Sequence, residues 1–212
     1  MSDVHVWRYP AQLLDPSKQQ AIPNLFNLDE FHKTAIFVDG PNINTSGKLS
    51  GERIDFDHLR AMFEQHSDLR HAYYYTPEYN RDNAGWPSMQ KFLEYLSYNR
   101  WTVVVRPRYH APDGRSRVYD IYPMMAAQIQ HLASADKVDT ILLVTNDADF
   151  SPLVHLCRNN CGTKFVHLSW TTQSEEQYTQ PNRELKLAVE VTLDVAMEPV
   201  AKHLLRDYVA DA

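Results

Sequence analysis

Residues 140–154, TILLVTNDADFSPLV, join an uninterrupted apolar run to two aspartates and a second apolar segment. The first five residues are all aliphatic or β-branched, which predicts a strand buried on both faces of a sheet. Asp147 and Asp149 follow where that strand should end. A helix is expected next, with Ser151 as its N-cap, a proline in its first turn and Gly162 beyond its end. This stretch therefore predicts one strand–helix unit of an α/β fold.

Strands and helices alternate on both sides of this unit. The segment after Gly40, rich in Gly, Asn and Ser, is expected to be a loop. Further buried strands are predicted at residues 34–38, 71–75, 102–106 and 164–168, and apolar residues at helical spacing predict helices at residues 54–65, 86–98 and 121–132. Alternation of this kind is typical of a parallel sheet covered on both faces. We therefore predict a three-layer α/β/α, Rossmann-like fold with a mostly parallel central sheet.

The two ends of the chain are less regular than its middle. Residues 1–33 lack strong periodicity and are interpreted as an N-terminal extension of a domain that spans residues 34–170. Residues 171–212 form a C-terminal extension expected to pack on the domain or on a partner subunit, so a homo-oligomer is possible. Within it, the alternation of residues 185–195 favours a strand, although the spacing of Leu185, Ala188, Val189 and Thr192 would also suit a helix. Residues 200–210 suggest a terminal helix.

Composition places the chain among soluble, globular proteins. Hydrophobic residues make up 43% and charged residues 23% of 212 residues. No apolar run approaches the ~20 residues needed to span a bilayer, so no membrane association is expected. The polar N-terminus does not resemble a signal peptide, which favours a cytoplasmic location. Cys157 and Cys161 are interpreted as reduced packing residues, because no second pair exists to complete a zinc site.

Positive charge is concentrated in one segment of an acidic protein. The chain carries a net charge of −6, but residues 100–117 contain five arginines and one aspartate and so carry +4. A local basic stretch of this kind indicates a site for a polyanion. The alternative interpretation is a solvated hairpin around Asp113 and Gly114.

Four aspartates are predicted to meet at one edge of the sheet. Asp39 ends the first strand, Asp147 and Asp149 follow the strand at residues 140–144, and Asp120 opens the helix after the basic segment. Ligands of open parallel sheets bind at the carboxyl ends of the strands. Taken singly, an aspartate such as Asp120 or Asp149 can be interpreted as a helix cap, and Asp39 before Gly40 as part of a turn, but these interpretations do not explain why all four lie at the same edge.

Carboxylates gathered in this way indicate a site for a hard cation. Two like charges about 5 Å apart repel by roughly 3 kcal/mol at an effective dielectric constant of 20, so several such pairs favour either protonation or a bound cation. Oxygen ligands suit Mg²⁺ or Mn²⁺. On an extended backbone, Asp147 and Asp149 would point to the same side about 6.5 Å apart. Divalent ions held between carboxylates are suited to phosphodiester hydrolysis.

The motifs around these aspartates resemble those of the NYN domain family of PIN-like ribonucleases. IFVDGPNI at residues 36–43, VYDIYPMMAAQI at residues 118–129 and LLVTNDADFSPLV at residues 142–154 occur in the family's order. The resemblance covers roughly residues 33–170. It implies a PIN-like fold, a Mg²⁺ or Mn²⁺ site and action on RNA. One departure is the bulky Tyr119 before the middle aspartate.

The resemblance assigns roles to individual residues. Asp39, Asp120, Asp147 and Asp149 are similar to the family's metal-binding acids, and Asn42 to a catalytic polar residue. Binding of single-stranded RNA is expected to involve Lys48, Arg106, Arg108, Arg115, Arg117, Thr145 and Asn146. The function that follows is metal-dependent hydrolysis of RNA. The alternative is a non-catalytic RNA-binding or regulatory module that retains the shape of the site.

Overall fold

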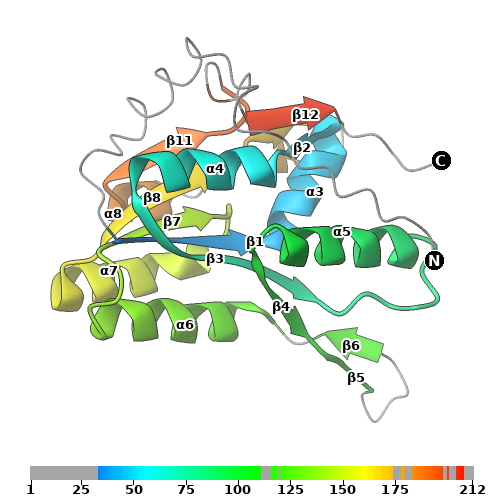
Figure 1. The fold of residues 1–212 in the computed structure, drawn as a ribbon, viewed down its shortest axis with the longest axis horizontal. Helices are drawn as coiled ribbons and strands as arrows, with labels where there is room; N and C mark the ends of the chain where they lie inside the picture. Colours follow the sequence, from blue (N-terminus) through cyan, green and yellow to red (C-terminus); the bar gives the residue numbers. More distant parts are fainter. Residues whose placement is uncertain are drawn as a thin grey trace.

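A single parallel sheet forms the centre of the fold (Figure 1). The computed structural model describes residues 33–110, 116–118, 120–173, 178–179, 183–197, 200 and 204–207. Six strands pair in the order β11-β8-β7-β1-β3-β4, and every neighbouring pair is parallel. They are β1 (Lys33–Asp39), β3 (Asp68–Pro77), β4 (Thr102–Arg106), β7 (Thr140–Val144), β8 (Lys164–Ser169) and β11 (Val191–Asp194).

Helices cover both faces of this sheet. One face packs against α3 (Gly40–Ser50), α4 (Phe56–His66) and α5 (Trp86–Tyr98), and the other against α6 (Tyr122–Ser134), α7 (Ser151–Cys161) and α8 (Arg183–Ala188). Successive residues of β1 alternate between the two cores, with Ile36 and Val38 in the first and Ala35 and Phe37 in the second. The predicted three-layer α/β/α architecture is confirmed.

The order of the strands creates a switch point between β1 and β7. From β1 the chain builds outward through β3 to β4, then returns to β7 and builds through β8 to β11. The carboxyl ends of β1 and β7 lie side by side, with Val38 in register with Val144. The helices that follow these two ends turn to opposite faces, and open sheets of this kind bind ligands in the crevice that results.

The predicted loop after Gly40 is in fact the helix α3. Its N-cap is Asp39, whose side chain accepts a hydrogen bond from the Asn42 backbone, and Pro41 lies in its first turn. The helix has few large apolar residues, so apolar periodicity did not reveal it. It buries the small residues Gly40, Ser46 and Gly47 instead, which lets its backbone approach the sheet closely.

The C-terminal part differs from its prediction in two places. Residues 185–195 do not form one strand, because the chain forms α8 up to Ala188 and pairs with β8 only from Val191 onwards. The sheet therefore continues past residue 170. The second difference lies within the predicted terminal helix at residues 200–210. There Leu205–Asp207 form β12, which pairs antiparallel with β2 (Glu52–Ile54). A further short ribbon joins β9 (Thr172–Gln173) to β10 (Tyr178–Thr179).

The basic segment forms an antiparallel ribbon of β5 (Arg108–His110) and β6 (Ser116–Val118). It leaves the carboxyl end of β4 and projects beyond the helical layers (Figure 1). The turn around Asp113, the predicted site residue Arg115 and the N-terminal extension to residue 32 lie outside the described residues. In the part of the chain that is described, no helix has both the length and the apolar character needed to cross a membrane.

Candidate functional site

Asp39 is the most deeply buried of the four predicted aspartates, with 6% of its surface exposed. It sits at the carboxyl end of β1, where its Oδ1 accepts a hydrogen bond from the Asn42 backbone at 3.2 Å and caps α3. Its Oδ2 accepts a hydrogen bond from the Thr145 hydroxyl at 2.9 Å. Both oxygens are thus oriented by the two chain segments that meet at the switch point.

This environment weakens the acidity of Asp39. The pKa of its carboxyl rises from the ordinary 3.8 to about 6, chiefly because burial disfavours the charged form. The hydrogen bonds from Thr145 and Asn42 lower the pKa, whereas the charges of Asp147 and Asp120 raise it. The carboxylate of Asp39 is therefore ionised at neutral pH at a cost that a bound cation would remove.

Thr145 links Asp39 to the turn that follows β7. It is fully buried, and its hydroxyl both donates to Asp39 and accepts a hydrogen bond from the Asp147 backbone at 3.0 Å. The sequence predicts that Thr145 contacts RNA, but in the structure its hydroxyl is buried and already engaged by Asp39 and by the Asp147 backbone. The role that the structure supports is to position the two aspartates relative to each other.

Asn146 has a similar internal role. Its backbone N–H donates to the Asn42 side-chain oxygen at 2.9 Å. Its side-chain amide donates to the Trp170 carbonyl at 2.7 Å and accepts from the Trp170 N–H at 2.8 Å. Asn146 is expected from the sequence to contact RNA, but both ends of its side-chain amide are used to join the ends of β7 and β8.

Asp147 and Asp149 are predicted to lie on an extended stretch, and the structure differs. Asp147 is the N-cap of a 3₁₀ turn, η3 (Ala148–Phe150), and its Oδ1 accepts a hydrogen bond from the Asp149 backbone at 3.0 Å. The turn removes the side-by-side arrangement expected of a strand. Nor is Ser151 the N-cap of α7, since that position is held by Phe150. Gly162 follows the end of α7, as predicted, and adopts the left-handed conformation.

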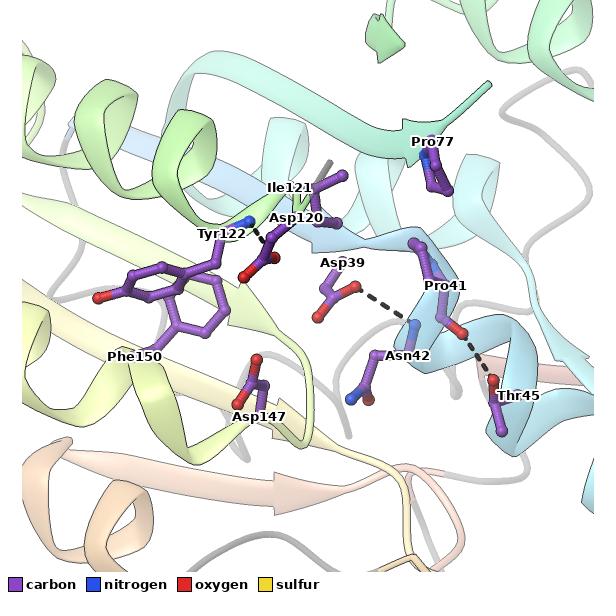
Figure 2. A pocket seen from close by; sticks show the side chains of 10 residues that line it. All are labelled: Asp39, Pro41, Asn42, Thr45, Pro77, Asp120, Ile121, Tyr122, Asp147 and Phe150. Atoms are coloured by element: carbon purple, nitrogen blue, oxygen red, sulfur yellow. Dashed lines mark hydrogen bonds between the residues drawn. The ribbon is translucent and has the colours of Figure 1, made fainter. Parts of the chain in front are cut away.

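Three of the aspartates share one open pocket of about 520 Å³. Figure 2 shows the carboxylates of Asp39, Asp120 and Asp147 directed into the same space, with Asn42 beside them. Asp120 is exposed, and its Oδ1 accepts the Tyr122 N–H at 2.9 Å at the start of α6. Asp149 is exposed and does not line the pocket.

The pocket also has apolar walls that the sequence did not identify as part of the site. Tyr122 and Phe150 lie on one side of the carboxylates, and Pro41 and Pro77 on the other (Figure 2). Their positions in the sequence held a signal. Tyr122 comes two residues after Asp120, and Phe150 directly follows Asp149, so each is carried to the sheet edge by the same turn as a predicted aspartate.

The chemistry of the donors fits Mg²⁺ or Mn²⁺. The pocket offers three carboxylates, which are oxygen ligands, and the most buried carboxylate has a raised pKa. Among the described residues, no group of three or more His, Cys, Asp or Glu side chains is arranged so that it could hold an ion directly. Mg²⁺ commonly keeps several waters and uses only one or two carboxylates, which these positions allow.

The predicted basic residues lie at different distances from the pocket. Arg106 ends β4 in register with Pro77, which lines the pocket. Arg108 begins the ribbon and donates hydrogen bonds to Glu78 through its backbone N–H and its guanidinium. Arg117 is exposed on β6. Lys48 lies in the last turn of α3, about 12 Å along the helix from the end that faces the pocket, and is therefore remote from it.

His167 supports the site from within the sheet. It is fully buried on β8, and its Nε2 lies 2.6 Å from the Thr145 carbonyl oxygen. Burial lowers its pKa from 6.5 to about 4, although the hydrogen bond to Thr145 acts in the opposite direction. The imidazole is thus neutral at physiological pH and donates to that carbonyl.

Acid is expected to destabilise the protein through His167. In the unfolded chain His167 binds a proton below pH 6.5, whereas in the folded chain it binds one only near pH 4. The contribution of His167 to the free energy of unfolding is therefore complete above pH 6.5 and is lost as the pH falls towards 4. The full loss is about 3 kcal/mol. In urea unfolding at pH 7.5, 6 and 5, the free energy of unfolding should fall less steeply with decreasing pH for His167→Gln than for wild type. Replacement of the exposed His155 by Gln should leave this pH dependence as it is in wild type. Equal slopes for His167→Gln and wild type would contradict this assignment.

The chain resembles known proteins in sequence and in fold. The NYN domain family matches residues 33–189. A crystal structure of a protein of unknown function from Vibrio parahaemolyticus superposes with a TM-score of 0.63 at 21% sequence identity, covering 79% of this chain and 94% of that one. At this identity the likeness concerns the fold alone. No curated protein matches the chain.

Proposed function

The chain belongs to the NYN domain family, which implies a PIN-like, nuclease-type domain, and on this premise we propose that it is a metal-dependent ribonuclease. The observation that carries the proposal is the meeting of Asp39, Asp120 and Asp147 in one pocket. These residues come from three distant parts of the sequence, and the pocket lies where open parallel sheets bind their ligands.

In this proposal Asp39, Asp120 and Asp147 hold one or more divalent ions, with Asp149 at the margin of the site. A bound Mg²⁺ or Mn²⁺ would supply charge neutralisation for the phosphate and a source of nucleophilic water. Asn42 has its side-chain oxygen fixed by the Asn146 N–H, so its NH₂ group is oriented to donate to a phosphate oxygen. Thr145 keeps Asp39 in place throughout.

The basic residues would receive the RNA backbone next to the pocket. Arg106 and Arg117, together with Arg115, belong to the segment that leads from β4 through the ribbon to Asp120. Cations along such a projection neutralise phosphates without reading the sequence. Lys48 is left out of this role because of its distance from the pocket. A cytoplasmic setting, where single-stranded RNA is available, is part of the proposal.

The proposal is tested with 5′-labelled single-stranded RNA and the full chain. We expect cleavage in millimolar Mn²⁺ or Mg²⁺ and none in EDTA. Mn²⁺ should also raise the melting temperature, because the ion binds only the folded state. Asp39→Asn protein purified in parallel controls for contaminating nuclease. Binding of RNA without cleavage under every metal condition would favour the non-catalytic RNA-binding module instead, and no binding would overturn both.

A further inference from the structure

An aromatic pair stands beside the carboxylates of the pocket. Tyr122 is the first residue of α6, and the backbone on both sides of it is fixed. Its N–H is held by Asp120 at 2.9 Å, and Pro123 follows it in the first helical turn. The backbone that carries the tyrosine ring therefore has a defined position relative to one of the proposed metal ligands.

Phe150 supports that ring from a different element. Phe150 is 1% exposed, and its ring lies edge-to-face with Tyr122 at a centroid distance of 4.8 Å and an interplanar angle of 67°. Tyr122 is only partly buried and lines the pocket. Figure 2 shows both rings on the same side of the pocket, next to Asp120 and Asp147. A partly exposed ring backed by a buried one forms a rigid platform.

The position of the Tyr122 ring does not depend on its hydroxyl. The buried Tyr74 hydroxyl, by contrast, is engaged by the Asn44 side chain. Within the described residues, no hydrogen-bond partner of the Tyr122 hydroxyl is found, and the ring is supported instead by its contact with Phe150.

We propose that Tyr122, supported by Phe150, stacks the nucleobase next to the phosphate that enters the carboxylate pocket, and thereby selects unpaired RNA. The inference rests on the proposed function and adds a subsite to it. Every nucleobase has a flat face, so stacking tolerates any sequence. A base within a duplex is already stacked and paired on both sides and would have to be extruded first.

Removal of the ring should weaken binding of single-stranded RNA about tenfold or more. The test uses fluorescence anisotropy with a labelled 12-nucleotide RNA, in which one base at a time is replaced by an abasic ribose. Wild type, Tyr122→Phe, Tyr122→Leu and Tyr122→Ala are compared. Leucine keeps apolar cover over Phe150 without a flat face, which separates stacking from loss of fold, and thermal melting checks that each variant is folded.

We expect the Tyr122→Phe variant to bind the RNA as wild type does, and the Tyr122→Leu and Tyr122→Ala variants to bind it weakly. An abasic ribose at one position of the RNA should weaken its binding to wild type and to the Phe variant by the same factor. At that position it should not weaken binding to the Leu and Ala variants any further. Duplex RNA should bind all four proteins equally. Leu and Ala variants that bind as wild type, or that lose as much as wild type at every abasic position, would overturn the inference while leaving the proposed function intact. Failure of wild type to bind RNA would overturn both.

Discussion

Replacement of Asp39 by asparagine is expected to abolish most RNA cleavage and, at the same time, to make the metal-free protein more stable at neutral pH. Loss of residues that merely support a metal ligand lowers affinity or activity about 10- to 100-fold, so loss of the ligand itself should reduce cleavage on the order of 100-fold or more. Asparagine keeps the oxygen that caps α3 but cannot supply the charge that a hard cation requires.

The gain in stability follows from the raised pKa of Asp39. The pKa of Asp39 is about 6 in the folded protein, above the ordinary 3.8. Its contribution to the free energy of unfolding is therefore favourable below pH 3.8 and is lost as the pH rises through 6. At neutral pH the buried charge therefore lowers the free energy of unfolding by about 3 kcal/mol, part of which asparagine should restore. The difference in stability between variant and wild type should shrink as the pH falls from 7.5 to 5.

Asp55 provides a matched control for this variant. It caps α4 with nearly the same backbone angles, φ −77° and ψ 94° against φ −82° and ψ 90° at Asp39, and its side chain accepts the His58 N–H at 2.9 Å. It pairs with Arg206 and does not line the pocket. Asp55→Asn should change stability by less than about 1 kcal/mol and leave cleavage unchanged. Undiminished cleavage by Asp39→Asn would rule out Asp39 as a metal ligand.

Replacement of Gly40 by alanine should be the most destabilising single-methyl addition near the site. A Cβ at this position would lie 2.6 Å from the Tyr75 carbonyl oxygen and 2.7 Å from two atoms of the Tyr74 side chain. Tyr74 is fully buried and its hydroxyl accepts a hydrogen bond from the Asn44 side chain, so the Tyr74 ring has little room to move. Relief would require a shift of the backbone where Asp39 is oriented. We expect a loss of about 3 kcal/mol and reduced cleavage.

Gly85→Ala is the control for the effect of a glycine substitution itself. Gly85 precedes α5 with φ −79°, which any residue adopts, and the nearest atom to an added Cβ is the Asn83 side-chain oxygen at 3.4 Å. Its melting temperature should stay close to that of wild type, whereas Gly40→Ala should melt about 10 °C lower. Equal melting temperatures would mean that the backbone between β1 and α3 is not as tightly packed as described.

Much of the architecture could be predicted because its signals are local. The runs at residues 34–38, 102–106 and 140–144 are short, apolar and bounded by polar residues, and each forms a strand. Parallel strands place their carboxyl ends at one edge, so Asp39 and Asp147 could be expected near each other without any coordinates. Those inferences need only the side-chain period and the direction of the strands.

Elements stabilised by distant contacts could not be predicted in the same way. α3 offers few apolar residues of its own and gains its stability from an N-cap and from close packing of small residues against the sheet. β12 pairs with β2, although about 150 residues separate them in the sequence. The alternation in residues 185–195 favours a strand, but some of the same residues also have helical spacing, and only the edge of β8 decides where the strand begins.

By itself, the sequence determined the strand–helix alternation and the edge at which the aspartates gather, since both follow from periodicity and chain direction. Only the tertiary structure decided how the individual side chains are used. The Thr145 hydroxyl orients Asp39, the Asn146 amide joins β7 to β8, and the turn at η3 carries Asp149 away from the pocket. Each of these outcomes depends on a hydrogen-bond partner or a local turn, and a buried polar group takes whichever partner the completed fold brings within reach.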